Sequence, residues 1–138
     1  MLTSTVIALA ITTSGITLPP LSKEDVVCLA QNVYHEARDQ SERGQVAVTH
    51  VVLNRMKSDR YPGTACKVIR QAMWENGQIV KDKCQFSWYC DGRPDVNPDR
   101  PTEKDAWEKS LQIALDADRK STRLNSSHVR TSRMPSSA

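Results

Sequence analysis

Apolar residues recur at spacings of three and four positions between residues 23 and 38. At about 100° of rotation per residue they fall on one stripe, which predicts an amphipathic helix. Ser22 stands before this segment with Asp25 three residues later, a pattern close to a capping box. The stripe consists of Val26, Val27, Leu29, Ala30, Val33, Tyr34 and Ala37.

A second helix is predicted from about Ser41 to Lys57, because its apolar run is long and lacks the two-residue period of a strand. Apolar side chains occupy most of its circumference, so we expect it to be buried in the middle of the domain. His50 and Asn54 would then have to bond each other and the backbone, or line a cleft. The apolar residues are Val46, Ala47, Val48, Val51, Val52 and Leu53.

The middle of the chain predicts shorter elements. After a turn at residues 61–63, Thr64 is expected to cap a short helix that ends near Met73. Residues 78–80 and 85–89 have the composition of short strands or extended loops.

An irregular, proline-containing region at 91–101 precedes a last helix capped by Thr102, with Asp105 three residues later. Together these elements predict a small, mainly helical α+β domain with a short strand or loop segment. The residues expected to be buried in the last helix are Ala106, Trp107, Leu111, Ala114 and Leu115.

The two ends of the chain differ from the part between them. Residues 1–20 lack charge and contain an apolar run shorter than the roughly 20 residues of a membrane span. They predict a secretory signal or a weak anchor with transient membrane contact; a disordered or weakly buried segment is the alternative. Residues 119–138 predict a disordered tail and read like a translated cloning adapter, which leaves 21–118 as the folded domain.

The charge of the chain is concentrated in that tail. The net charge is +3, with 19 basic and 16 acidic residues. Five of the basic residues and no acid lie within 119–138, so the rest of the chain carries 14 basic and 16 acidic residues. We therefore expect no nucleic-acid partner, since a nucleic-acid surface would rest on the tail alone.

The four cysteines form an even set within the predicted domain: Cys28, Cys66, Cys84 and Cys90. With an export signal they predict two disulfides, and three connectivities are open. Their spacing contains no C-x2-C pair, so no metal is expected to bind them. If the protein were cytosolic, they would be buried free thiols.

Glu36 stands at the edge of the apolar stripe of the first helix. On a helical wheel it lies about 20° beyond Leu29, whereas His35 falls on the opposite face and Arg38 lies well away from Glu36. A carboxyl at the boundary of the core loses part of its hydration, which raises its pKa. Such a group can hold a proton near neutral pH and act as a general acid; a rim glutamate bonded to an amide or a lysine is the alternative.

A zinc peptidase motif is excluded at the same place. The HExxH pattern needs a second histidine at position 39, which is Asp39. We therefore expect no metal and no other cofactor.

Five blocks of sequence, in consistent order, resemble one family. They are CLAQNVYHEAR at 28–38, GQVAV at 44–48, VVLNR at 51–55, YPGTAC at 61–66 and CQFSWYCDG at 84–92. In these blocks the chain resembles the SleB/CwlJ-type cell wall hydrolases, which include the spore cortex-lytic enzymes.

The resemblance implies a lysozyme-like domain that cleaves peptidoglycan between N-acetylmuramic acid and N-acetylglucosamine. It places the catalytic acid of the family at Glu36 and implies a lytic transglycosylase, in which the muramic C6 hydroxyl attacks C1. The sequence shows no second acid with comparable placement, because Asp39 and Glu42 lie in a short turn expected to be solvated. One acid with an internal nucleophile needs no partner, unlike a hydrolase that uses two carboxyl groups.

The segment around residue 86 is expected to form a wall that binds sugar. If it is extended, polar and aromatic side chains alternate between its two faces, and core packing of the aromatics is the alternative. Asn54 and Arg55 belong to a matching block and are expected to brace the site. The substrate-binding residues predicted in this segment are Gln85, Phe86, Ser87 and Trp88.

From Ser121 onward the chain departs from the family, which predicts a domain truncated at its C-terminal end and an incomplete site. We expect an extracytoplasmic, monomeric protein with peptidoglycan as its partner. A noncatalytic peptidoglycan-binding module would need the sugar wall without Glu36. A Cys–His peptidase would need a free thiol near His35 or His50.

Overall fold

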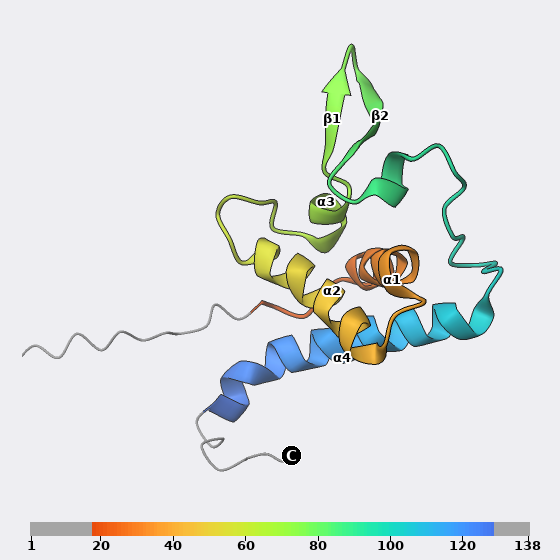
Figure 1. The fold of residues 1–138 in the computed structure, drawn as a ribbon. Helices are drawn as coiled ribbons and strands as arrows, with labels where there is room; N and C mark the ends of the chain where they lie inside the picture. The colour runs from red at the N-terminus through yellow and green to blue at the C-terminus, as the bar shows by residue number, and fades with distance from the viewer. Residues whose placement is uncertain (1–17, 129–138) are drawn as a thin grey trace, which may run out of the picture.

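The structure is a computed structural model that describes residues 18–128 (Figure 1). The predicted segments 1–20 and 119–138 therefore lie partly outside the described residues. In chain order the elements are α1 (Lys23–Ala37), α2 (Glu42–Met56), α3 (Ala65–Ile69), β1 (Ala72–Glu75), β2 (Gln78–Cys84), the 3-10 helix η1 (Ser87–Cys90) and α4 (Lys104–His128). The combination of helices with a two-stranded sheet confirms a small, mainly helical α+β domain.

Helix α1 lies at the centre of the domain and packs against α2, α3 and α4. Its apolar stripe is buried as the spacing predicts, with Leu29, Ala30 and Val33 fully enclosed. The expectation that α2 is the buried central helix is wrong, because Val51 of α2 is 42% exposed. Helix α2 packs against α1, α3 and α4, but its outward face, which carries Val51, remains at the surface.

Side-chain caps begin three of the helices, and the sequence predicts the caps at Ser22 and Thr64. The Ser22 hydroxyl accepts a hydrogen bond from the amide of Asp25, and Ser41 accepts one from Gly44. Thr64 caps α3 by accepting from the amide of Lys67. These short bonds satisfy amides that the first turn of a helix leaves without intrahelical partners.

Strands β1 and β2 pair antiparallel and form a hairpin that projects from the helical body (Figure 1). Asn76 and Gly77 at its tip have φ angles of 51° and 76°, as a two-residue type I′ turn requires. Residues 78–80 are therefore strand, as expected. The predicted extension of α3 to Met73 is wrong, since α3 ends at Ile69 and β1 has begun by then.

Helix α4 runs along the domain beneath α1 and α2 (Figure 1). Trp107 and Ala114 are buried as predicted, but Leu115 is 39% exposed because it lies on the outer side of the helix. The disorder expected from residue 119 is corrected for residues 119–128, which continue the helix. A helix that has already formed extends at little cost, so a segment without an apolar face can remain helical.

All four cysteines are paired in two disulfides, and no cysteine is free. Cys28 of α1 is bonded to Cys66 of α3, and Cys84 at the end of β2 is bonded to Cys90 at the end of η1. The pairing selects one of the three open connectivities. It also excludes the Cys–His peptidase, which needs a free thiol.

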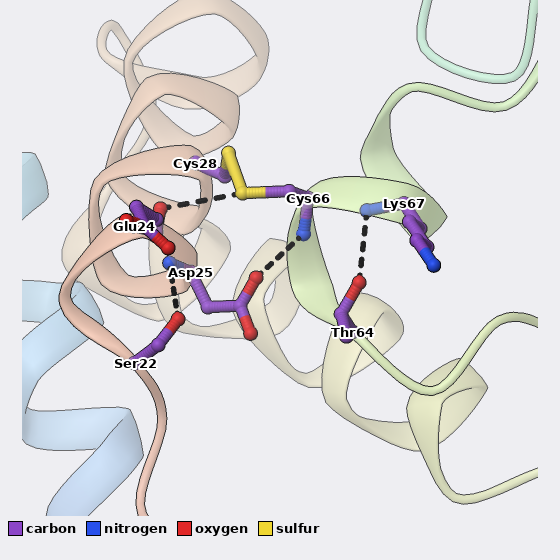
Figure 2. The surroundings of a disulfide bond; sticks show 7 residues. All are labelled: Ser22, Glu24, Asp25, Cys28, Thr64, Cys66 and Lys67. Carbon is purple, nitrogen blue, oxygen red and sulfur yellow. Dashed lines mark hydrogen bonds between the residues drawn. A yellow bond between two sulfur atoms is a disulfide. The ribbon is translucent and has the colours of Figure 1, made fainter.

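Figure 2 shows how the first disulfide is reinforced. The carboxylate of Asp25 accepts a hydrogen bond of 3.0 Å from the backbone amide of Cys66. The sulfur of Cys66 also lies 3.3 Å from the carbonyl oxygen of Glu24, but a disulfide sulfur carries no proton to donate. The start of α1 and the start of α3 are thus joined by one covalent bond and one hydrogen bond.

Among the described residues, no helix combines the length and the apolar character needed to cross a membrane.

Removing the two disulfides separately is expected to have unequal effects. Chain entropy for bonds at sequence separations of 38 and 6 gives about 4 and 2 kcal/mol of stabilisation, respectively. Cys28→Ala with Cys66→Ala should therefore lower the free energy of unfolding, measured by urea denaturation, about twice as much as Cys84→Ala with Cys90→Ala. Equal losses would contradict the assignment of the first bond as the main covalent restraint.

Candidate active site

A groove of about 540 Å³ lies where the C-terminal end of α1 meets η1 and residues 91–103. We call it the main groove, and residues 91–103 the wall segment. Helix α1 contributes His35 and Glu36, and η1 contributes Ser87 and Trp88. From the wall segment the lining residues are Asp91, Arg93, Pro94, Asp95, Val96, Asn97, Arg100, Thr102 and Glu103.

Glu36 lines the main groove from the last turn of α1. It is an exposed residue overall, but the groove removes part of the hydration of its carboxyl group, and this burial raises its pKa above the ordinary 4.5. The direction is the one expected for a carboxyl at the boundary of the core. Glu36 therefore retains its proton at a higher pH than a fully solvated glutamate does.

The helical wheel placed His35 on the face of α1 opposite the apolar stripe, away from Glu36. In the structure His35 and Glu36 line the same groove. The His35 imidazole stacks on the indole of Trp88 with ring centroids 4.5 Å apart, and its Nε2 accepts a 3.0 Å hydrogen bond from the amide of Val96. The face of α1 opposite its main stripe is covered by η1 and the wall segment. A wheel drawn for one helix contains no information about that cover.

The charged form of His35 is disfavoured in this position. Burial lowers its pKa below the ordinary 6.5, and the nearby Arg38 guanidinium lowers it further. The carboxylate of Asp91 acts in the opposite direction, raising it. The hydrogen bond from Val96 also requires an unprotonated Nε2, because a backbone amide can only donate.

Trp88 is held in place by a buried polar contact. It is 7% exposed, and its indole Nε1–H donates a 2.8 Å hydrogen bond to Oδ1 of Asn32, a fully buried residue of α1. One ring face meets His35. Trp88 therefore reaches the main groove as part of its supporting structure.

The residues predicted to bind substrate fall into two places, because the expectation of an extended segment is wrong at η1. The 3-10 turn brings Ser87 and Trp88 to the main groove. Gln85 instead lines a separate hollow beside Tyr61 and Met73.

Phe86 packs against the core, where the Arg55 guanidinium lies 5.5 Å from its ring centre. Asn54 is exposed on α2 and is not among the residues that line the main groove. His50 is exposed as well, so the expected burial of this i, i+4 pair is wrong.

The structure contradicts the expectation that no second acid has comparable placement. Asp91, Asp95 and Glu103 line the main groove together with Glu36. Burial and the neighbouring Asp91 carboxylate raise the pKa of Asp95. The one sequence signal was the place of Asp91 in the matching block at 84–92, directly after Cys90.

Two of these acids are already engaged by the protein. Asp91 accepts a 2.8 Å hydrogen bond from the amide of Arg93. Glu103 lies 3.2 Å from Nε of Arg38, whose guanidinium also lies 4.7 Å from the ring centre of Tyr34. Arg38 is thus directed to Glu103, in agreement with the expectation that it does not neutralise Glu36.

These features define a small α+β domain with an acid-lined groove, and its sequence places it in a family. A family model described as Cell Wall Hydrolase matches residues 39–131, about two thirds of the chain. The chain belongs to this cell wall hydrolase family. The matched range includes the whole wall segment but begins after Glu36, so membership does not assign a role to Glu36.

Three relatives are spore cortex-lytic enzymes. The chain is 46% identical over 48 residues to that of Bacillus subtilis and to that of Oceanobacillus iheyensis, covering 35% of this chain and 16% and 17% of theirs. It is 32% identical over 83 residues to that of Halalkalibacterium halodurans, covering 60% of this chain and 22% of the relative. The chain thus spans about a fifth or less of these relatives' length, and no solved structure matches it.

Trp88→Phe is expected to lower the free energy of unfolding by about 1–3 kcal/mol, because it leaves the buried Oδ1 of Asn32 without its donor. Nδ2 of Asn32 already lacks a partner among the described residues. Adding Asn32→Leu should recover part of the loss, since removing both polar partners is close to neutral. Urea denaturation of Trp88→Phe, Asn32→Leu and the double variant measures the coupling energy between the two side chains. Strictly additive losses would show that the Trp88–Asn32 bond makes no such contribution.

Proposed function

We propose that this protein cleaves the glycan strands of peptidoglycan between N-acetylmuramic acid and N-acetylglucosamine. Membership of the cell wall hydrolase family supports the substrate class. The observation that carries the proposal is the position of Glu36 at the end of a central helix, in an open groove that raises the pKa of its carboxyl. An open groove suits a polymer that must enter from the side.

In the proposed reaction Glu36 acts first as the general acid. Its proton passes to the glycosidic oxygen as the bond from that oxygen to the muramic C1 breaks, which leaves oxocarbenium character on the muramic ring. The resulting Glu36 carboxylate then takes the proton of the muramic C6 hydroxyl while that oxygen bonds to C1. The products are a strand ending in 1,6-anhydromuramic acid and a free 4-hydroxyl on the departing sugar, and Glu36 is protonated again.

Asp95 represents the alternative chemistry. Asp91 and Glu103 are held by Arg93 and Arg38, which leaves Asp95 as the wall carboxyl best able to activate water or attack C1. Asp95 stands on an irregular segment, whereas Glu36 stands on a packed helix, and rigid elements position catalytic groups more accurately. We therefore assign the chemistry to Glu36 alone, as a lytic transglycosylase.

The other groove walls supply the contacts that a sugar strand needs. Arg93, Asn97, Arg100 and Thr102 present donors and acceptors to the main groove, suited to hydroxyl and N-acetyl groups. Two disulfides also fit an oxidising compartment, so we place the activity outside the cytoplasm.

Glu36→Gln should reduce the clearing of purified sacculi by about 10²–10⁴-fold, the usual contribution of a general acid. The amide keeps the shape of the side chain, so binding to sacculi in a pull-down should persist. The matched control is Asp39→Asn, an exposed acid three residues away that does not line the main groove. It should leave clearing unchanged. If Glu36→Gln still clears sacculi, the assignment of the acid is wrong; if the unaltered protein binds without clearing, the protein is a binding module.

Mass analysis of the released muropeptides should find 1,6-anhydro ends, and Asp95→Asn should change neither the products nor the rate by more than about twofold. Reducing ends together with loss of activity in Asp95→Asn would instead identify a two-carboxylate hydrolase. The two measurements separate these outcomes because only the hydrolase needs a second carboxyl group.

A further inference from the structure

Besides the Arg38–Glu103 ion pair at its end, the wall segment is attached to α1 at Val96. Its amide donates to Nε2 of His35 over 3.0 Å, and its carbonyl accepts from Nε2 of Gln31 over 3.3 Å. Its side chain is 9% exposed and joins the hydrophobic core. The residues on either side, Asp95 and Asn97, are exposed and line the main groove.

His35 is the one member of this attachment whose bonding depends on protonation. Neutral imidazole offers Nε2 as an acceptor, but imidazolium carries a proton on both nitrogens and cannot accept. Protonation would therefore place two N–H groups against each other at the Val96 contact. Gln31 makes the second bond and does not titrate.

We propose that His35 is a positioning residue for Glu36: in its neutral form it holds the wall segment on α1, and its protonation releases that wall. The effect of His35 on the reaction of Glu36 rests on the proposed function, whereas its hold on the wall segment does not. His35 is next to Glu36 in the chain, and both line the main groove.

The charged groups that line the main groove with His35 come from α1 and the wall segment, while the η1 residues that line it, Ser87 and Trp88, carry no charge. Helix α1 contributes Glu36 and Arg38, and the wall segment contributes Asp91, Arg93 and Asp95, with Arg100 and Glu103 at its end. Arg38 opposes protonation and Asp91 favours it, while burial is the largest influence and opposes it.

The sign of the pH effect follows from the lowered pKa of His35. Below the ordinary value of 6.5 the unfolded chain takes up a proton that the folded chain resists, so stability is fully present above 6.5 and decreases as pH falls toward the folded value. The proposed reaction also needs the protonated form of Glu36, so activity should fall as pH rises through the pKa of Glu36. Activity should therefore have an acid limb below 6.5 set by His35 and an alkaline limb above 4.5 set by Glu36.

Two substitutions distinguish the contribution of the Nε2 acceptor of His35 from that of its aromatic ring. Gln is long enough to offer an oxygen acceptor near the position of Nε2 and does not titrate, whereas Phe keeps a ring against Trp88 and offers no acceptor. His50 of α2 is exposed and lies outside the main groove, so His50→Gln is the matched control.

The first measurement is the hydrogen-exchange protection factor of the Val96 amide, followed by NMR without substrate. A range of about pH 7.5 to 4 spans the ordinary pKa values of both histidine and glutamate. Protection in the unaltered protein should fall roughly tenfold as His35 protonates. His35→Gln should keep protection across the range, His35→Phe should lack it throughout, and His50→Gln should behave like the unaltered protein. Protection that is constant with pH in the unaltered protein overturns the inference, even if His35→Phe fails to fold.

The second measurement is the pH profile of sacculus clearing. His35→Gln should rescue the activity lost in His35→Phe and should lack the acid limb, while its alkaline limb remains. An acid limb that persists in His35→Gln overturns the positioning role. If nothing clears sacculi at any pH while Val96 protection still follows His35, the proposed function fails and the wall attachment stands.

Discussion

The attachment of Val96 to α1 is the constraint on which the main groove depends. The wall segment has no regular secondary structure between η1 and α4, so its own backbone bonding does not fix its path. The path is fixed by other contacts: the Val96 amide donates to His35, its carbonyl accepts from Gln31, and its side chain packs in the core. The Arg38–Glu103 ion pair holds the end of the segment. Every acid that lines the groove, other than Glu36, stands on the segment held in this way.

Helix α1 serves two surfaces at once. Its main stripe packs on α2, α3 and α4, while the face that carries His35 receives η1 and the wall segment. Glu36 lies between these two surfaces, which explains how it can be exposed to a groove and still lose part of its hydration. The bond from Trp88 to Asn32, a buried residue of α1, ties η1 to the buried part of this helix.

The features that the sequence predicted correctly are local ones. The caps at Ser22 and Thr64, the start of α2 near Ser41 and the buried stripe of α1 depend on residues a few positions apart, so spacing is sufficient to find them. The position of α2, the exposure of Asn54 and the acids of the wall segment depend on contacts across many tens of residues. The bond between Val96 and His35 spans 61 positions, and no periodicity in either segment indicates it.

The electrostatics of the groove follow from the same attachment. Burial raises the pKa of Glu36, whereas the pKa of Asp95 is raised by burial and also by Asp91. A change at Asp91 should therefore act directly on Asp95, while Glu36 responds to whatever alters the groove walls. If the wall segment leaves α1, Glu36 regains water and its pKa returns toward 4.5. The raised pKa of the proposed acid thus depends on the burial that the groove walls provide, so the attachment of the wall segment also favours the protonated form of Glu36.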